Sequence, residues 1–511
     1  MGKFFAGAGS ALIGGALSGI SNLFGALGTV GKMLQNSLSR GGAKRTKKNP
    51  APELEKGTFD YISEPKSDYF SVGFAKTDVM PDDMDKTKYY VAGYKINNPA
   101  KGALDPMTAS AIWIDDQSGR GGVVFVSIDD IGLTNYDVGI IRDLLADFKK
   151  ETGCRSINIM SIHNHASIDT VGFWGPLPRS GRNKKYMEML RQKVKQVVID
   201  AYNDRREGDL YYGKKEAEEI QRDSRLPEVY SKDVTRFRFV PKDGSREVWM
   251  INFASHTESL LGKNSYVSAD FAGYLRNEIL EKTGAETIYF VGAIGGLIRL
   301  KELDEDNVKS TMMGGQSIAH TAIAIEDERK LRPILNYMRQ EYYAQCDNYV
   351  LALVQRVGIL KSHAAYTGKG SLNMSIHTEM NYFELDGLKL LFLPCELFPE
   401  LAYGGYLDAE GSAEGKSPDI NPTPLLQTAD DDNMLIFCLS NDFTGYVVPP
   451  NDFYLNPNEP YINGARDRLD RRHYEETNSL GPETAPIVAS VFAGIMDTVN
   501  KTKAEAEKAV K

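Results

Sequence analysis

Two histidines separated by one residue, His163 and His165, follow an apolar run of strand type, Ile157–Ile162. Side chains two residues apart on an extended chain point to the same face, so both imidazoles can reach one pocket just beyond the strand. Neutral imidazole is the commonest transition-metal ligand in proteins and a common general acid or base. The pair therefore indicates metal binding or proton transfer, and solvated imidazoles at a polar strand end are the alternative.

Further side chains of this kind follow other predicted strands. The strands and the residues just beyond them are Val248–Ala254 with His256, Leu388–Leu393 with Glu396, and Met434–Leu439 with Tyr446. In open α/β sheets, ligands and catalytic groups gather beyond the carboxyl ends of the strands. Two imidazoles and a carboxylate with one position left open suit a catalytic zinc site, where a nearby base such as His165 could deprotonate the water. The alternatives stay open at this stage: a core histidine at 256, a helix N-terminal carboxylate at 396 and ordinary packing of Tyr446.

The elements that must position these residues alternate along the chain. A strand over Gly122–Ile128 is followed by a helix whose apolar face runs from Val138 to Phe148, with Gly153 after it, and then by the strand that delivers His163. This order is a βαβ unit and predicts a parallel pair of strands. Further helices are expected at 187–201 and 271–279, and a strand at 288–291 runs into the glycine-rich turn 292–296. The predicted fold class is therefore α/β, with mixed or parallel sheets, flanking helices and a metal site at the strand C-terminal ends.

Composition restricts the function classes. The chain has 511 residues, 42% of them hydrophobic and 25% charged, which is ordinary for a globular protein with a large core. Its formal net charge of −9 gives no overall attraction for nucleic acid or anionic lipid. The cysteines Cys154, Cys346, Cys395 and Cys438 are far apart and form no CxxC pair, so they fit buried thiols rather than a thiolate zinc site.

The N-terminal segment differs from the rest. Phe4–Gly31 contains no charged residue and is rich in Gly and Ala, and basic residues follow it from Lys32 to Lys48. Three interpretations remain open: a membrane span with its basic flank on the cytoplasmic side, a signal peptide, and a flexible or membrane-surface tail. We expect membrane association of some kind. Lys44–Gly57 has the composition of a linker, so the predicted division is 1–57, apolar segment plus basic linker, and 58–511, catalytic domain.

A series of motifs in fixed order resembles the catalytic domain of the neutral (non-lysosomal) ceramidases, a family that cleaves N-acyl sphingosine into sphingosine and fatty acid. The resemblance covers roughly residues 69–498. The segments that carry it are Val72–Asp78, Ala92–Tyr94, Val126–Asp129, Ile162–Ser167, Phe253–His256, Val267–Asp270, Pro394–Glu396, Leu439–Tyr446 and His473–Glu475.

The resemblance implies a role for each matching position. It implies zinc ligands at His163, His256, Glu396 and Tyr446. It further implies His165 as the acid/base residue, Tyr474 as a phenol donor near the oxyanion, and Arg222 as the group that polarises the substrate carbonyl, the last through the looser match Gln221–Ser224. Preorganised donors at an oxyanion lower the barrier by several kcal/mol.

The chain departs from the family in three places. Gly295 stands where the family motif has a serine, and a glycine cannot be a nucleophile, so an acyl-enzyme at that position is excluded if the alignment holds. The family's C-terminal immunoglobulin-like domain is expected to be absent. Extra sequence at Pro449–Arg472, rich in Pro, Asn and Asp, is predicted to form a lid or rim loop.

The predicted function is a zinc-dependent hydrolase that cleaves an amide bond in an N-acylated, ceramide-like lipid, with zinc-activated water and His165 as acid/base. Two alternatives stay open: a metal-binding pseudo-enzyme or lipid-binding protein without turnover, which Gly295 motivates, and a zinc hydrolase of an ester. The expected cofactor is Zn²⁺, and the expected partner is a lipid or small-molecule substrate, with no nucleic acid. The protein is expected to be membrane-associated: secreted or on the cell surface by family resemblance, or on the cytoplasmic face by charge asymmetry.

Overall fold

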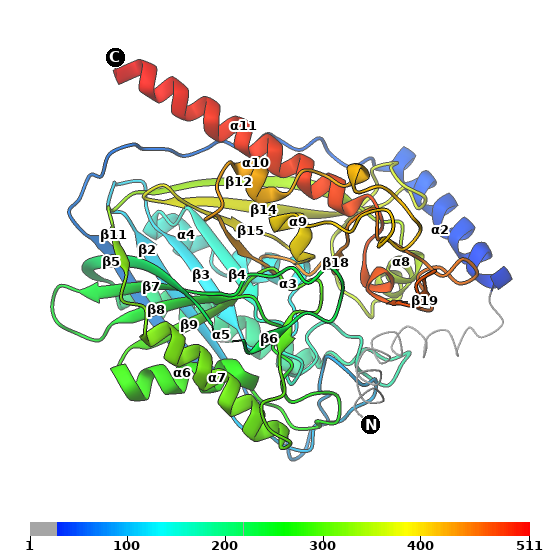
Figure 1. Cartoon of the computed structure of the whole chain (residues 1–511), viewed down its shortest axis with the longest axis horizontal. Coiled ribbons are helices and arrows are strands. Elements are labelled where there is room, and N and C mark those ends of the chain that lie inside the picture. Colours follow the sequence, from blue (N-terminus) through cyan, green and yellow to red (C-terminus); the bar gives the residue numbers. More distant parts are fainter. Residues whose placement is uncertain (1–27, 218, 511) are drawn as a thin grey trace.

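A mixed sheet of nine strands is built from the first part of the chain in the computed structural model, which describes residues 28–217 and 219–510 (Figure 1). The strand order is β4-β3-β2-β1-β5-β7-β8-β9, and β11 pairs with β5. The strands are β1 (Phe70–Asp78), β2 (Thr108–Asp115), β3 (Val123–Ile128), β4 (Ser156–Ser161), β5 (Arg206–Glu216), β7 (Asp233–Pro241), β8 (Val248–Phe253), β9 (Glu286–Val291) and β11 (Glu328–Leu331).

Parallel pairing occurs at both ends of this strand order. β3 pairs with β4 and β8 with β9 in parallel, and the other neighbours along the order pair antiparallel. The four parallel strands are buried at every position except Glu286 at the start of β9, as expected for strands covered on both faces. The segments that follow β4 and β8 meet, since Asn164 bridges Thr257 and the His165 amide donates to the Thr257 carbonyl at 2.9 Å. The sheet is therefore curled enough to bring two distant strand ends together.

A second sheet packs against the first. Its order is β12-β14-β15-β17, with β13 on β14, and only β15 and β17 pair in parallel. The strands are β12 (Leu335–Gln345), β13 (Ala364–Ala365), β14 (Ser375–Leu385), β15 (Leu388–Phe392) and β17 (Leu435–Phe437). Aromatic rings fill the space between the sheets: Phe125 of β3 stacks on Phe392 of β15 at 5.1 Å between centroids and meets Phe383 of β14 at 5.0 Å. This burial of aromatic surface joins the two sheets.

Helices lie outside the sheets (Figure 1). α5 covers β1 and β2, α6 and α7 pack together beside β9 and β7, and α11 runs along β12. Among the described residues, no helix combines the length and apolar composition that crossing a membrane requires. The helices are α2 (Gly28–Lys48), α3 (Asn135–Leu144), α4 (Ala146–Thr152), α5 (Lys184–Asn203), α6 (Asp270–Thr283), α7 (Asn307–Ile323), α8 (Tyr349–Arg356), α9 (Pro399–Tyr403), α10 (Leu425–Ala429) and α11 (Thr484–Val510), with 3₁₀ turns at Pro418–Ile420 and Glu475–Asn478.

The predicted fold class, α/β with mixed sheets and flanking helices, is confirmed. Two local expectations were wrong. The single helix expected over 138–148 is broken into α3 and α4 at Leu145, whose φ of −106° and ψ of 10° leave the helical region while its side chain stays fully buried. The predicted linker begins as helix, because α2 continues to Lys48. Most of the uncharged segment Phe4–Gly31 lies outside the described residues, and the predicted domain division stays a prediction.

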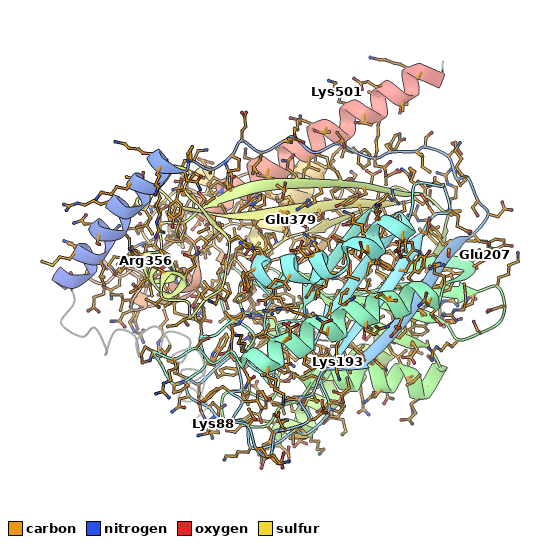
Figure 2. The ribbon with its side chains drawn as sticks, turned by 180° about the vertical axis from the view of Figure 1, so that it is seen from behind. Lys88, Lys193, Glu207, Arg356, Glu379 and Lys501 are labelled. Atoms are coloured by element: carbon orange, nitrogen blue, oxygen red, sulfur yellow. The ribbon has the colours of Figure 1, made fainter. Side chains whose placement is uncertain are left out.

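A buried charge network ties the second sheet to β4. The Glu379 carboxylate on β14, whose position is labelled in Figure 2, accepts hydrogen bonds from Arg142 at 2.8 and 2.9 Å, from Arg339 at 2.7 Å and from Asn441 at 2.8 Å. The Asn441 side chain in turn accepts from the Ile159 amide in β4 at 2.8 Å. Burial raises the pKa of Glu379, but Arg142 outweighs it and holds that pKa below its usual range. The network thus fixes the strand that leads to His163.

We predict that Glu379→Ala lowers the free energy of unfolding by about 3–5 kcal/mol, because it leaves the Arg142 guanidinium in a buried position without its carboxylate. Urea unfolding measures the change. Glu341→Ala is the matched control, since Glu341 pairs with Arg339 at the exposed surface and its loss is expected to cost less than about 1 kcal/mol. Equal losses in the two variants would contradict this interpretation of the network.

Candidate metal centre

His163 is the first of two imidazoles whose orientation is fixed by a main-chain carbonyl. It follows β4 with φ of +59°, a left-handed conformation that is uncommon for a residue with a side chain and is typical of functional sites. Its Nδ1 lies 2.9 Å from the Ile131 carbonyl oxygen. Because a carbonyl only accepts, Nδ1 carries the proton, and Nε2 faces the Glu396 carboxylate at 3.2 Å.

His256 repeats this arrangement from the other end of the first sheet. Its Nδ1 donates to the Ile298 carbonyl at 3.1 Å, and its Nε2 lies 3.3 Å from the same Glu396 oxygen, Oε2. The side chain is fully buried. Two imidazoles therefore present Nε2 to one carboxylate oxygen. Burial raises the pKa of Glu396, but the adjacent His163 and His256 outweigh it and hold that pKa well below its usual range.

Glu396 and Tyr446 come from the second sheet's loops and stand side by side. β16 (Glu396–Leu397) pairs in parallel with β18 (Tyr446–Val447), and the register places Glu396 opposite Tyr446. The approach requires a glycine at 445, where φ is +80° and an added Cβ would lie 1.9 Å from the Asn478 carbonyl oxygen. Burial raises the pKa of the Tyr446 phenol well above its usual value. The pairing of β16 with β18 thus places Glu396 and Tyr446, the two oxygen ligands expected for the metal, next to each other.

Several polar atoms at this point are buried without a hydrogen-bond partner within the described part of the chain. They are His256 Nε2, Glu396 Oε2, the Tyr446 hydroxyl, and both ring nitrogens of His165. Nitrogens of His163, His165 and His256 also lie within 4.8 Å of one another. Leaving buried polar atoms unpartnered costs free energy, and a shared cation removes that cost. Imidazoles with a carboxylate and a phenol are a donor set that suits Zn²⁺, so the residues present fit the expected metal.

His165 differs from the other two imidazoles. Its Nδ1 lies 3.5 Å from Glu258 Oε2, and the Tyr94 hydroxyl donates to that same oxygen at 2.6 Å. The edge of the Tyr94 ring meets the imidazole at 5.1 Å between centroids. Burial, and then the charges of His163 and His256, hold the pKa of His165 well below its usual value, so the imidazole is neutral. Its closest carboxylate is thus Glu258 rather than Glu396.

Glu258 and Tyr94 were missed by the sequence reasoning. Glu258 stands only two residues beyond His256, so its place in the same strand-end segment was a usable signal. Tyr94 belongs to the motif Ala92–Tyr94 that carries the resemblance, but no site role was assigned to it, because its contact with Glu258 joins segments that are far apart in the sequence.

The two remaining predicted residues, Arg222 and Tyr474, are both influenced by the charge of Glu258. Arg222 belongs to β6 (Gln221–Arg222), which pairs with β10 (Arg299–Leu300) and places Arg222 opposite Arg299. Burial, and then Arg299, lower the pKa of Arg222, while Glu302 and Glu258 oppose that shift. Tyr474 is buried, and its closest cation is Arg225, whose guanidinium lies 5.0 Å from the ring centroid and pairs with Glu475.

An apolar pocket opens onto four of the candidate site residues. His163, His165, Glu396 and Tyr446 form one part of its wall. The rest is mostly apolar and comprises Ile131, Phe173, Trp174, Cys346, Leu351, Leu360, Met374, Ile376, Phe443 and Leu480, with Gln355, Ser362, Thr444, Gly445 and Asn478 as the other members. A pocket with apolar walls and a few convergent polar groups is the usual form of a small-molecule site. No lining residue belongs to Pro449–Arg472, and its role as a lid or rim loop stays a prediction.

The structure explains why a glycine stands at position 295. A Cβ at this position would lie 2.4 Å from the Phe398 amide nitrogen and 2.7 Å from the Leu397 carbonyl oxygen. The Gly295 amide instead donates to that carbonyl at 2.8 Å, directly beside Glu396. A serine would force the two backbones apart, so the glycine here holds the loop 292–296 against β16.

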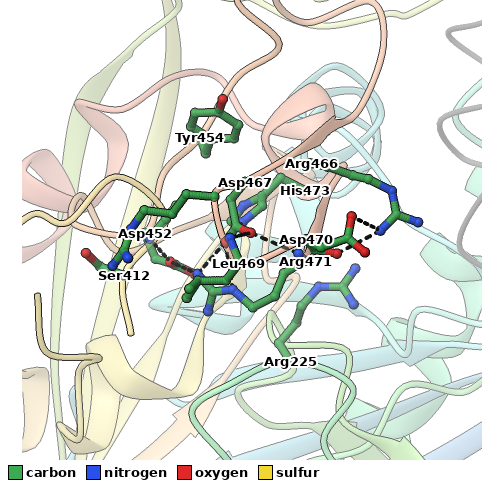
Figure 3. Close-up of polar contacts among 12 residues, drawn as sticks. Arg225, Ser412, Asp452, Tyr454, Arg466, Asp467, Leu469, Asp470, Arg471 and His473 are labelled. Atoms are coloured by element: carbon green, nitrogen blue, oxygen red, sulfur yellow. Dashed lines mark hydrogen bonds and ion pairs between the residues drawn. The ribbon is translucent and has the colours of Figure 1, made fainter. Parts of the chain in front are cut away.

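The loop Pro449–Arg472 is held by a second buried charge cluster (Figure 3). Arg471 donates to Asp467 at 2.7 Å and to Asp452 at 2.8 Å. His473 contacts Asp467 at 3.2 Å through Nε2 and Glu476 at 2.8 Å through Nδ1. Burial lowers the pKa of His473, but the hydrogen bond and charge of Glu476 outweigh it and raise the pKa to about 9. The charged imidazole thus stabilises the segment that contains Tyr474.

Comparisons with known proteins give the fold. No protein-family model matches the chain, and no curated protein matches it in sequence. Solved structures that resemble it include neutral ceramidase from Pseudomonas aeruginosa, with a TM-score of 0.61, 14% identity, and coverage of 84% of this chain and 75% of that one. A ceramidase complexed with C2 aligns with a TM-score of 0.63 and 13% identity over 85% of this chain and 76% of that one. The chain therefore has a neutral ceramidase-like fold.

The His473 cluster predicts a defined pH dependence of stability. The folded-state pKa, about 9, exceeds the ordinary value of 6.5, so the contribution is complete below about pH 6.5 and is lost as the pH rises toward about 9. The difference in free energy of unfolding between wild type and His473→Gln should shrink across that window. Urea titrations at several pH values measure it, and a difference that is constant or grows with pH would contradict the assignment.

Proposed function

We propose that this protein is a zinc-dependent hydrolase that cleaves an amide bond in an N-acylated, lipid-like substrate. One observation carries the proposal: a buried set of imidazole, carboxylate and phenol donors lies at the wall of an apolar pocket. The ceramidase-like fold supports the same reaction class, since the two structures named above are described as ceramidases.

His163, His256, Glu396 and Tyr446 are the residues that would hold the metal. Both imidazoles already have Nδ1 committed to a main-chain carbonyl, which leaves Nε2 for the ion. When bound, Zn²⁺ would supply a Lewis acid that polarises a carbonyl and makes water more acidic. The four buried side chains would hold that ion away from bulk solvent, and three of them, His163, Glu396 and Tyr446, line the pocket.

His165 is proposed to move the proton. As a neutral imidazole it can accept a proton from the attacking water and return it to the leaving amine, so that amide and water give a carboxylic acid and an amine. Glu258 is a positioning residue in this scheme. Its carboxylate, held by the Tyr94 hydroxyl, faces His165 Nδ1 and favours the tautomer with the proton on that atom. The other nitrogen, Nε2, is then free to accept.

The tetrahedral oxyanion would be stabilised by Tyr474 and Arg222 as donors. Burial keeps Tyr474 protonated, because it raises the pKa of that phenol well above its usual value. Gly295 supplies no nucleophile, so the water attacks the carbonyl directly. The acyl chain would lie against the apolar wall of the pocket, between Phe443, Leu351 and Met374.

We predict that the zinc content of single variants distinguishes the metal ligands from the acid/base residue. Protein purified without chelator should contain about one zinc per chain, His163→Ala and His256→Ala should lose most of it, and His165→Ala should keep it. The reason is that Glu396 contacts the first two imidazoles, whereas His165 faces Glu258. Elemental analysis together with a circular dichroism check of folding measures the effect.

The zinc measurement can also contradict the proposal. Wild-type protein without zinc would contradict the hydrolase, and loss of zinc in His165→Ala would make His165 a ligand instead of the base.

Turnover gives an independent prediction. His165→Ala should lower kcat on N-acyl amides about 10²–10⁴-fold, and Tyr474→Phe should lower it about 10²–10³-fold with little change in KM. Product analysis on N-acyl amides, acyl esters and phosphoesters measures substrate class. Stoichiometric zinc with no His165-dependent hydrolysis would identify a binding protein, and hydrolysis of esters alone would replace the amidase assignment.

A further inference from the structure

A strongly basic surface lies on one side of the molecule. α2 carries six cations, Lys32, Arg40, Lys44, Arg45, Lys47 and Lys48, and no acidic residue. The segment Asn348–Asn373 carries three more, Arg356, Lys361 and Lys369, and again no acidic residue. All nine side chains are exposed. We name these nine side chains the basic face. It contrasts with the whole chain, whose net charge is −9.

The two segments form one surface because they pack together. α2 contacts α8, and Gly41 lies beside the Arg356 side chain. Further along, Gly42 lies against the Leu372 backbone and Thr46 lies beside Gly368 (Figure 2 shows α2 next to Arg356). Arg45 donates to the Tyr366 hydroxyl, which fixes the end of the helix. The C-terminal half of α2 is thus anchored with its cations directed outward.

The cations of the basic face, apart from Arg45 on Tyr366, are free to meet a partner. Among the described residues, no ion pair is formed by any of the nine. Two large apolar side chains stand among them: Met33 on α2 is 63% exposed, and Val357 at the end of α8 is 62% exposed. These are the two most exposed large apolar side chains in the part of the chain that the structure describes. Cations interspersed with exposed apolar groups are typical of a surface that lies on a bilayer.

The same segment also forms part of the pocket. Leu351 and Gln355 on α8, and Leu360 and Ser362 after it, line the apolar pocket that reaches His163. One side of Asn348–Asn373 therefore faces the pocket and the other side carries part of the basic face. A bilayer resting on the basic face would lie directly outside the wall of the pocket.

We propose that the basic face docks this protein on an anionic lipid bilayer. Each lysine or arginine near such a surface contributes about 1 kcal/mol of attraction, so the nine cations are sufficient for stable binding. A nucleic acid would use the same charges, but it gives no reason for the exposed Met33 and Val357 or for the apolar pocket behind α8. The membrane contact assigned here comes from residues 32–48 and 348–373, and membrane association of the uncharged stretch Phe4–Gly31 stays a separate prediction.

The test is vesicle co-sedimentation of the full chain. Vesicles of phosphatidylcholine alone are compared with vesicles that contain about 30% phosphatidylserine, at about 0.1 M and about 0.5 M salt. Wild type should bind only the anionic vesicles and should be released at high salt. The triple variant Lys44→Glu, Lys47→Glu, Lys48→Glu should bind at least about 100-fold more weakly, since each lost lysine is worth about fivefold.

A matched control carries the same charge change elsewhere. Lys88, Lys149 and Lys150 are exposed and form no ion pair among the described residues. Replacing all three by Glu should weaken vesicle binding only through long-range charge, which salt screens. Equal weakening in both variants, equal binding to phosphatidylcholine alone, or binding to duplex DNA without binding to vesicles would each overturn the proposal. Binding is measured without turnover, so its failure is separate from failure of the proposed hydrolase.

Discussion

The candidate site depends on one contact: a buried carboxylate oxygen of Glu396 lies between the Nε2 atoms of two imidazoles, at 3.2 and 3.3 Å. An isolated carboxylate at this depth would be costly, and the two imidazoles compensate only in part because neither forms a well-directed hydrogen bond to it. Backbone groups keep the arrangement from relaxing. The carbonyls of Ile131 and Ile298 hold the rings, and the pairing of β16 with β18 holds the carboxylate.

The site also explains why two sheets are needed. The histidines follow strands of the first sheet, and Glu396 and Tyr446 come from loops that extend the second. The segment after β17 joins the two, because the Cys438 amide donates to Val291 in β9 and the Ser161 amide in β4 donates to Leu439. Gly295 and Gly445 allow the loops to approach more closely than any side chain would permit. The position of the donors therefore follows from packing between sheets as much as from any one strand.

The sequence could predict the elements because the informative signals are local. The apolar runs that became β3, β4, β8 and β9 are buried on both faces, and each of them was identified close to its observed bounds. The placement of His163 and His256 beyond strand ends followed from the same runs. What could not be predicted is contact between distant segments. Tyr94 and Glu258 approach His165, and Arg225 approaches Tyr474, only because distant loops cross in the folded chain. The hydrophobic periodicity of the sequence contains no information on such crossings. From the sequence, Gly295 could be interpreted only as the loss of a nucleophilic serine. The structure gives a steric reason for the glycine, because a side chain at this position would collide with the backbone of β16.

The central claim is that His163, His256, Glu396 and Tyr446 together hold one divalent ion. The most direct measurement is a crystal structure of the zinc-loaded protein with diffraction data collected on both sides of the zinc absorption edge. The account predicts a single anomalous peak bonded to the Nε2 atoms of His163 and His256 and to Glu396 Oε2, with the Tyr446 hydroxyl facing it. A peak bonded to His165 and Glu258 instead, or no peak at this position, would contradict it.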